Sequence, residues 1–76
     1  MNIENKNYYR YLGLNIAYFR KEKGLSQIQL AELIGISRTH MSRIETADCA
    51  VSLDVVFEIS RVLDTKPSKL FDFRSD

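Results

Sequence analysis

The fold is decided by residues 27–46, which read QIQLAELIGISRTHMSRIET. Two short helical patterns, Gln27–Ile34 and Arg38–Glu45, are separated by only a few residues. Helices joined by so tight a turn must cross at a steep angle. Such a crossing needs a small residue where the helices approach, which Ala31 supplies. It also needs a turn residue that tolerates positive φ, which Gly35 supplies. The stretch therefore predicts two crossed helices.

Apolar side chains within this stretch are spaced to hold both helices against a common body. They are Leu30 and Ile34 in the first helix, Ile36 in the turn, and Met41 and Ile44 in the second helix. Leu33 is expected on the same broad apolar face of the first helix. The body must therefore come from the rest of the chain.

A longer helix is predicted before the stretch, over about 6–23. Leu12, Ile16 and Phe19 recur there at i, i+4 and i+7, which makes one apolar stripe. Gly24 is a typical residue at the end of such a helix. Ser26, followed three residues later by a glutamine, is typical of a capping box at the next helix start.

Two further helices are predicted after a loop at 46–51. Ser52 is a cap for a helix to about Leu63, and Pro67 suits the first turn of a short fifth helix. The side chains expected to face inward are Leu53, Val56, Phe57, Ile59 and Leu63 in the fourth helix. No segment alternates as a strand would, so the fold class is all-α with five helices. We expect one domain at 8–73, with flexible tails at 1–7 and 74–76.

Composition limits the class of protein more than it identifies it. The net charge is +1, but residues 1–45 hold seven basic and four acidic side chains, and residues 46–76 hold four and six. A basic half that faces an anion and an ordinary surface both explain this division. Cys49 is the only cysteine, which indicates a reducing compartment, and no leader or membrane-spanning pattern is evident. We therefore expect a cytoplasmic protein.

The helix at Arg38–Glu45 has a polar outer face. Successive helical side chains lie about 100° apart, so Met41 and Ile44 define the direction of the core. Five polar side chains lie away from that direction: Thr39, Ser42 and Arg43 nearly opposite, and Arg38 and His40 on the flanks. Arginine is the usual bidentate partner of guanine, and hydroxyls can serve bases or phosphates. A polar surface that any exposed helix needs is the plainer interpretation.

Taken together, these residues resemble the Cro and phage-repressor type of helix-turn-helix, the XRE-like family. The residues that carry the resemblance are Arg20, Gly24–Gln27, Leu30–Ala31, Gly35, Ser37–Arg38, Ser42–Glu45 and Leu70–Phe71. The resemblance implies a compact lambda-repressor-like domain. It also implies a bacterial or phage transcriptional regulator, acting as a repressor, that binds double-stranded DNA as a homodimer.

The resemblance also implies roles for individual residues. Gln27, at the start of the second helix, would donate to a DNA phosphate. The other residues expected to contact DNA are Ser37, Arg38, Thr39, His40, Ser42 and Arg43. Arg20 would form a structural salt bridge with Glu45. The loop after the third helix departs from the family because it has Asp48 and no basic residue, which removes some expected phosphate contacts.

Several alternatives stay open at this point. The same fold can serve as a protein-interaction module of the antitoxin or adaptor type. Leu70, Phe71 and Phe73 either form a dimer interface, or the first two close the core with Phe73 on a loose tail. No catalytic group, metal site, cofactor or small-molecule ligand is indicated, because His40 and Cys49 alone do not make a ligand set.

Overall fold

The computed structural model describes residues 1–73, and the tail predicted at 74–76 lies outside them. A 3-10 helix at Ile3–Asn5 leads directly into α1. The five α-helices are α1 (Lys6–Glu22), α2 (Gln27–Ile34), α3 (Arg38–Glu45), α4 (Leu53–Val62) and α5 (Pro67–Leu70). The all-α, five-helix prediction is confirmed. Part of the predicted N-terminal tail is helical, since the Asn2 side chain accepts a hydrogen bond from the Glu4 amide at 2.9 Å.

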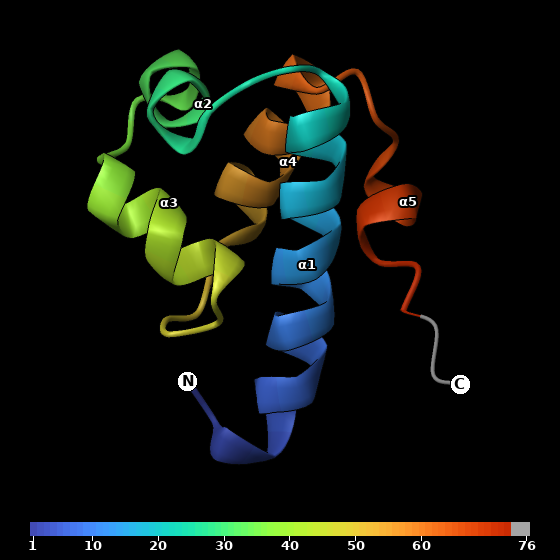
Figure 1. Cartoon of the computed structure of the whole chain (residues 1–76). Helices are drawn as coiled ribbons and strands as arrows, with labels where there is room; N and C mark the ends of the chain where they lie inside the picture. The colour runs from blue at the N-terminus through green and yellow to red at the C-terminus, as the bar shows by residue number, and fades with distance from the viewer. Residues whose placement is uncertain (74–76) are drawn as a thin grey trace.

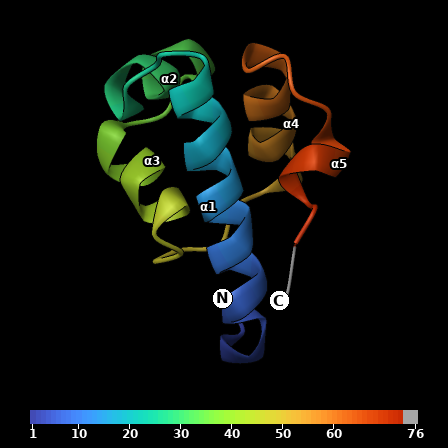
Figure 2. The same ribbon diagram turned by 45° about the vertical axis from the view of Figure 1, so that its right-hand side comes forward.

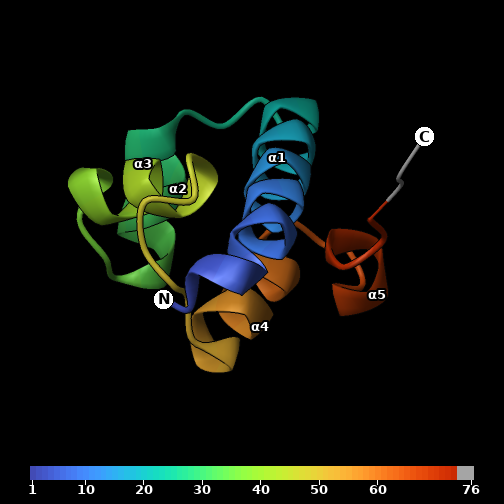
Figure 3. The same cartoon turned by 90° about the horizontal axis from the view of Figure 1, so that it is seen from below.

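Helix α1 is the central element of the fold (Figure 1). Helices α2 and α3 lie on one side of it and α5 on the other, as the turned view also shows (Figure 2). Seen from below, α1 lies between the α2–α3 pair and α5, and α4 lies on the lower side of α1 in the picture (Figure 3). In the described part of the chain, no helix is long and apolar enough to cross a membrane.

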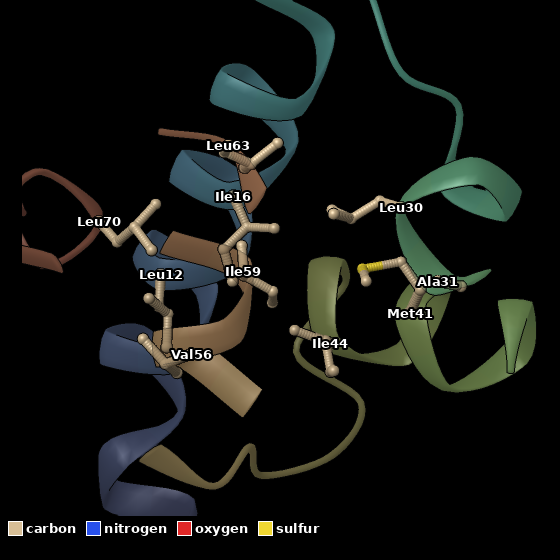
Figure 4. Close-up of a cluster of buried hydrophobic side chains, with 10 residues drawn as sticks. All are labelled: Leu12, Ile16, Leu30, Ala31, Met41, Ile44, Val56, Ile59, Leu63 and Leu70. Atoms are coloured by element: carbon tan, nitrogen blue, oxygen red, sulfur yellow. The ribbon is translucent and has the colours of Figure 1, made fainter. Parts of the chain in front are cut away.

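The core lies where the five helices meet (Figure 4). Its buried side chains are Leu12, Ile16, Leu30, Ala31, Met41, Ile44, Val56, Ile59, Leu63 and Leu70. Burying one large aliphatic side chain contributes about 1.5–3 kcal/mol. Every α-helix supplies at least one member of the core, so α2 and α3 are fixed on the same body as α1.

Three side chains that the sequence placed inward are exposed instead. Leu33, Leu53 and Phe57 are 57%, 60% and 49% exposed. At about 100° per residue, Leu33 and Phe57 lie roughly 100° from the centre of the buried stripe on their helices. Leu53, the first residue of α4, lies at the edge of its stripe, roughly 70° from the centre, where it lines an open hollow with Tyr8 and Phe71.

Local hydrogen bonds fix where α2, α3 and α4 begin. Ser26 Oγ accepts from the Gln29 amide at 3.0 Å, and Gln29 Oε1 accepts from the Ser26 amide at 2.8 Å, so the predicted capping box is present. Ser37 and Ser52 cap α3 and α4 by one bond each, since their hydroxyl oxygens accept from the His40 and Val55 amides. Gly35 ends α2 at φ 77°, as the sequence predicted.

Candidate nucleic-acid interface

Helix α3 is held to the body along one edge. Met41 and Ile44 are buried in the core, and Glu45 is buried at the end of the helix. The helix is only eight residues long, which is too short to be stable alone. Its position therefore depends on its contacts with α1 and α2.

Gly13 allows α1 to approach α3 very closely, a role that was not predicted from the sequence. A Cβ atom at this position would lie 2.5 Å from the Glu45 carbonyl oxygen and 2.7 Å from that of Ile44. No side chain fits at these distances, so glycine is required where the two backbones meet. An isolated glycine inside a long helical pattern was the available signal, because glycine is unfavourable there without a packing reason.

An ion pair between Arg20 and Glu45 ties the end of α3 to α1. Arg20 Nε donates to Glu45 Oε2 at 2.7 Å, and Arg20 Nη2 donates to Glu45 Oε1 at 3.0 Å. Both side chains are almost fully buried, at 9% and 5% exposed. Arg20 Nη1 also donates to the Leu25 carbonyl at 2.7 Å, which fixes the segment that leads into α2. The pair anticipated from the resemblance is therefore present, in bidentate form.

Gln27 joins the same cluster, which was not anticipated. Its Nε2 donates to Glu45 Oε1 at 2.9 Å, and the side chain is half-buried. The family resemblance implied only that Gln27 donates a hydrogen bond to a DNA phosphate. The hydrogen bond links the first residue of α2 to the last residue of α3.

The outward face of α3 gathers polar side chains around a shallow hollow. The residues that line it are Arg38, Thr39, Ser42 and Arg43, and its volume is about 280 Å³. Arg38, Thr39 and Arg43 are exposed, and Ser42 is half-buried. Within residues 1–73 neither arginine has an acidic partner, so both guanidinium groups are available to an anion.

The two remaining candidate DNA contacts have other positions. Ser37 is exposed, and its hydroxyl accepts a hydrogen bond from the His40 amide at 3.0 Å. His40 is half-buried on the flank of α3. The Ser37 hydroxyl still has a proton to donate while it caps the helix.

The loop after α3 is closed by its own side chains. Thr46 Oγ1 lies 2.7 Å from Asp48 Oδ2 and 2.9 Å from the Ser42 carbonyl oxygen. Ala47 lies at φ 61°, in the left-handed region that favours glycine. Cys49 is half-buried and packs against the core.

The residues suggested for a dimer interface divide into two kinds. Leu70 is fully buried, so the structure contradicts the alternative that placed it in a dimer interface and agrees with the one that placed it in the core. Phe71 is 40% exposed. Phe73 is half-buried, with its ring centroid 6.1 Å from that of Tyr8 and 5.9 Å from that of Tyr11, so it is not on a loose tail.

A short helix fixed on one edge and open on the other, following a helix and a tight glycine turn, defines a helix-turn-helix unit. Comparison with known families agrees with this geometry. The Helix-turn-helix family model matches residues 16–70, and the chain belongs to this family.

Individual relatives show the same likeness. The control protein C.SmaI of Serratia marcescens is 34% identical over 59 residues, which cover 78% of this chain and 70% of that protein. The restriction-modification controller protein C.AhdI of Aeromonas hydrophila has a crystal structure that superposes with a TM-score of 0.83. It is 31% identical, and the match covers 88% of this chain and 97% of that one.

A third relative has been solved with DNA. This is SinR, the master regulator for biofilm formation, whose complex structure superposes with a TM-score of 0.74 at 35% identity and covers 80% of this chain and 98% of that chain. Other relatives are much longer. The chain spans only 21% and 20% of the length of two transcriptional regulatory proteins from Pyrococcus species.

Proposed function

We propose that the chain is a sequence-specific DNA-binding transcriptional regulator, a repressor, that places α3 in the major groove. The observation that carries this proposal is the outward face of α3, where two arginines with no acidic partner among residues 1–73 flank two hydroxyl side chains. The likeness to SinR, solved in complex with DNA, supports the same function.

The chemistry of this face suits base edges. B-DNA's major groove, about 12 Å wide, admits an α-helix. Arg38 and Arg43 each have the planar fork of donors that pairs with guanine O6 and N7, and Thr39 can contact a base or a thymine methyl. Because α3 is fixed by its buried edge, its backbone presents these side chains from one position and on one side of the helix.

The first experiment is selection from random double-stranded DNA at low salt, followed by affinity measurements on the selected site. We expect one sequence motif to be enriched. If no motif is enriched, the regulator proposal fails, and a protein ligand becomes the better explanation of the fold.

The second experiment compares two arginine variants. Arg43→Ala should raise the Kd for the selected site about 5- to 150-fold, as expected for loss of a contact worth about 1–3 kcal/mol. Arg61→Ala is the control, because Arg61 is also exposed in the last turn of its helix, on α4, and its surface ion pair with Glu58 contributes little to stability. Both variants should melt close to the wild-type temperature. A large fall in the Tm of Arg43→Ala would show that Arg43 is structural.

We further propose that the chain acts as a homodimer on two half-sites. One copy measures 30 × 23 × 19 Å, so two adjacent copies are of the right size to bind half-sites about 34 Å apart on one side of the duplex. An apolar hollow of about 380 Å³ lies away from α3, and Tyr8, Leu53 and Phe71 line it with large exposed surfaces. Exposed apolar patches of this kind typically mark interaction sites.

The dimer proposal is tested by the mass in solution. Sedimentation equilibrium of the wild type should give twice the mass of one chain, 8.8 kDa. Leu53→Gln should shift the equilibrium toward the monomer, whereas Leu33→Gln, at a similarly exposed leucine on α2, should not. A wild type that stays monomeric at high micromolar concentration would contradict the proposal.

A further inference from the structure

Glu45 accepts three hydrogen bonds from two different elements. Both of its oxygens bond Arg20 of α1, and Oε1 also accepts from Gln27 Nε2 at 2.9 Å. The structural role of the ion pair accounts for Arg20 and not for Gln27. Gln27 is the first residue of α2, at the helix end whose dipole favours an anion.

The hydrogen bond fixes the orientation of the Gln27 amide. A glutamine side chain has two N–H donors in one plane. When one of them points to Glu45 Oε1, the other has a set direction away from the carboxylate. In the described part of the chain no acceptor is bonded to this second donor. A side chain held in this way loses less conformational entropy on binding than a free glutamine does.

The charges next to Gln27 are compatible with the binding of a phosphate. An unpaired carboxylate beside a phosphate site would repel DNA. The Arg20 guanidinium lies in direct contact with Glu45, and both side chains are shielded from solvent. The pair is therefore neutral as a unit, and it gives Gln27 an acceptor without adding a net negative charge.

We infer that Glu45 is a positioning residue for DNA binding, which orients the Gln27 amide so that its second N–H donates to a phosphate oxygen. The inference rests on the proposed DNA-binding function, and it gives the buried ion pair a second role. The same carboxylate fixes α3 against α1 and orients the Gln27 side chain of α2 toward a DNA phosphate. The base contacts of α3 and the phosphate contact of α2 are therefore held in a constant relative position.

A double-mutant cycle on DNA affinity tests the inference. The variants are Gln27→Ala, Glu45→Gln and the double variant, measured on the selected site well below their melting temperatures. Glu45→Gln should weaken binding at least threefold more in the wild-type background than in the Gln27→Ala background. An equal loss in both backgrounds would show that Glu45 acts only by holding α3.

The salt dependence gives a second readout. Gln27→Ala should weaken binding about three- to tenfold while the slope of log K against log salt stays unchanged, because a neutral amide displaces no counterion. An unchanged affinity of Gln27→Ala would overturn the inference. Absence of any DNA binding by the wild type is a different result, since it rejects the proposed function itself.

A measurement on the wild type covers the case in which Glu45→Gln does not fold. In NMR spectra of the free protein, one Nε2 proton of Gln27 should exchange slowly with solvent. Gln29 is the matched control, because its Oε1 is bonded to the Ser26 amide and its Nε2 has no partner in residues 1–73. Equally fast exchange of both side chains would overturn the inference.

Discussion

Replacing Gly13 by alanine tests the closest contact in the fold. The new Cβ would lie 2.5 Å from the Glu45 carbonyl oxygen, whereas ordinary van der Waals contact begins at 3.4 Å. The two backbones must therefore separate by about 0.9 Å, the difference between these distances. Both neighbouring oxygens belong to backbone carbonyls, so no flexible side chain can move aside.

Two opposing effects set the size of the change. Alanine in place of glycine inside a helix is favourable by about 1 kcal/mol. Overpacking costs about 1–3 kcal/mol, and a contact with rigid backbone belongs at the upper end. We expect Gly13→Ala to lower the free energy of unfolding by about 2 kcal/mol. A domain of 76 residues has a total of about 4–11 kcal/mol.

The assay is thermal unfolding followed by circular dichroism. A loss of about 2 kcal/mol should lower the Tm by roughly 8–16 °C. Because the displaced segment is the end of α3, the affinity for the selected DNA should fall as well. A Gly13→Ala variant that melts at or above the wild-type temperature would show that only helix propensity acts there, and it would refute the close approach.

Two other substitutions probe stability, both by urea denaturation. Arg20→Ala should lower the free energy of unfolding by about 3–5 kcal/mol, since it leaves the buried carboxylate of Glu45 without its counterion. An unchanged denaturation curve would show that the Arg20–Glu45 ion pair does not stabilise the fold. Asp64→Gly should raise the free energy of unfolding by about 1 kcal/mol, because Asp64 lies at φ 50° and is exposed; a loss of stability would mean that the aspartate has a role beyond its backbone conformation.

Local signals predicted the helices well. The capping box at Ser26, the glycine turn at Gly35 and the core stripe of Met41 and Ile44 depend on residues close together in the chain. Short-range hydrogen bonds and helical periodicity determine such features, so the sequence contains the information directly.

Features that depend on distant parts of the chain were harder to predict. Leu53 lies at the edge of the apolar stripe of α4, and the burial of an edge position depends on which elements pack beside it. The bond from Gln27 to Glu45 joins residues 18 positions apart, and it requires the crossing geometry of α2 and α3. Leu70 could not be assigned to the core or to a dimer interface, because an apolar residue near a terminus fits both equally well.

The division of α3 into a buried edge and an open edge has a consequence for how such proteins diversify. Met41, Ile44 and Glu45 account for the attachment of the helix, while Arg38 and Arg43 make no intramolecular ion pair within residues 1–73. We therefore expect substitutions at these two arginines to change the free energy of unfolding little. Under the proposed DNA-binding function, a duplicated copy of this chain would acquire a new target sequence through a few such changes, without passing through an unstable intermediate.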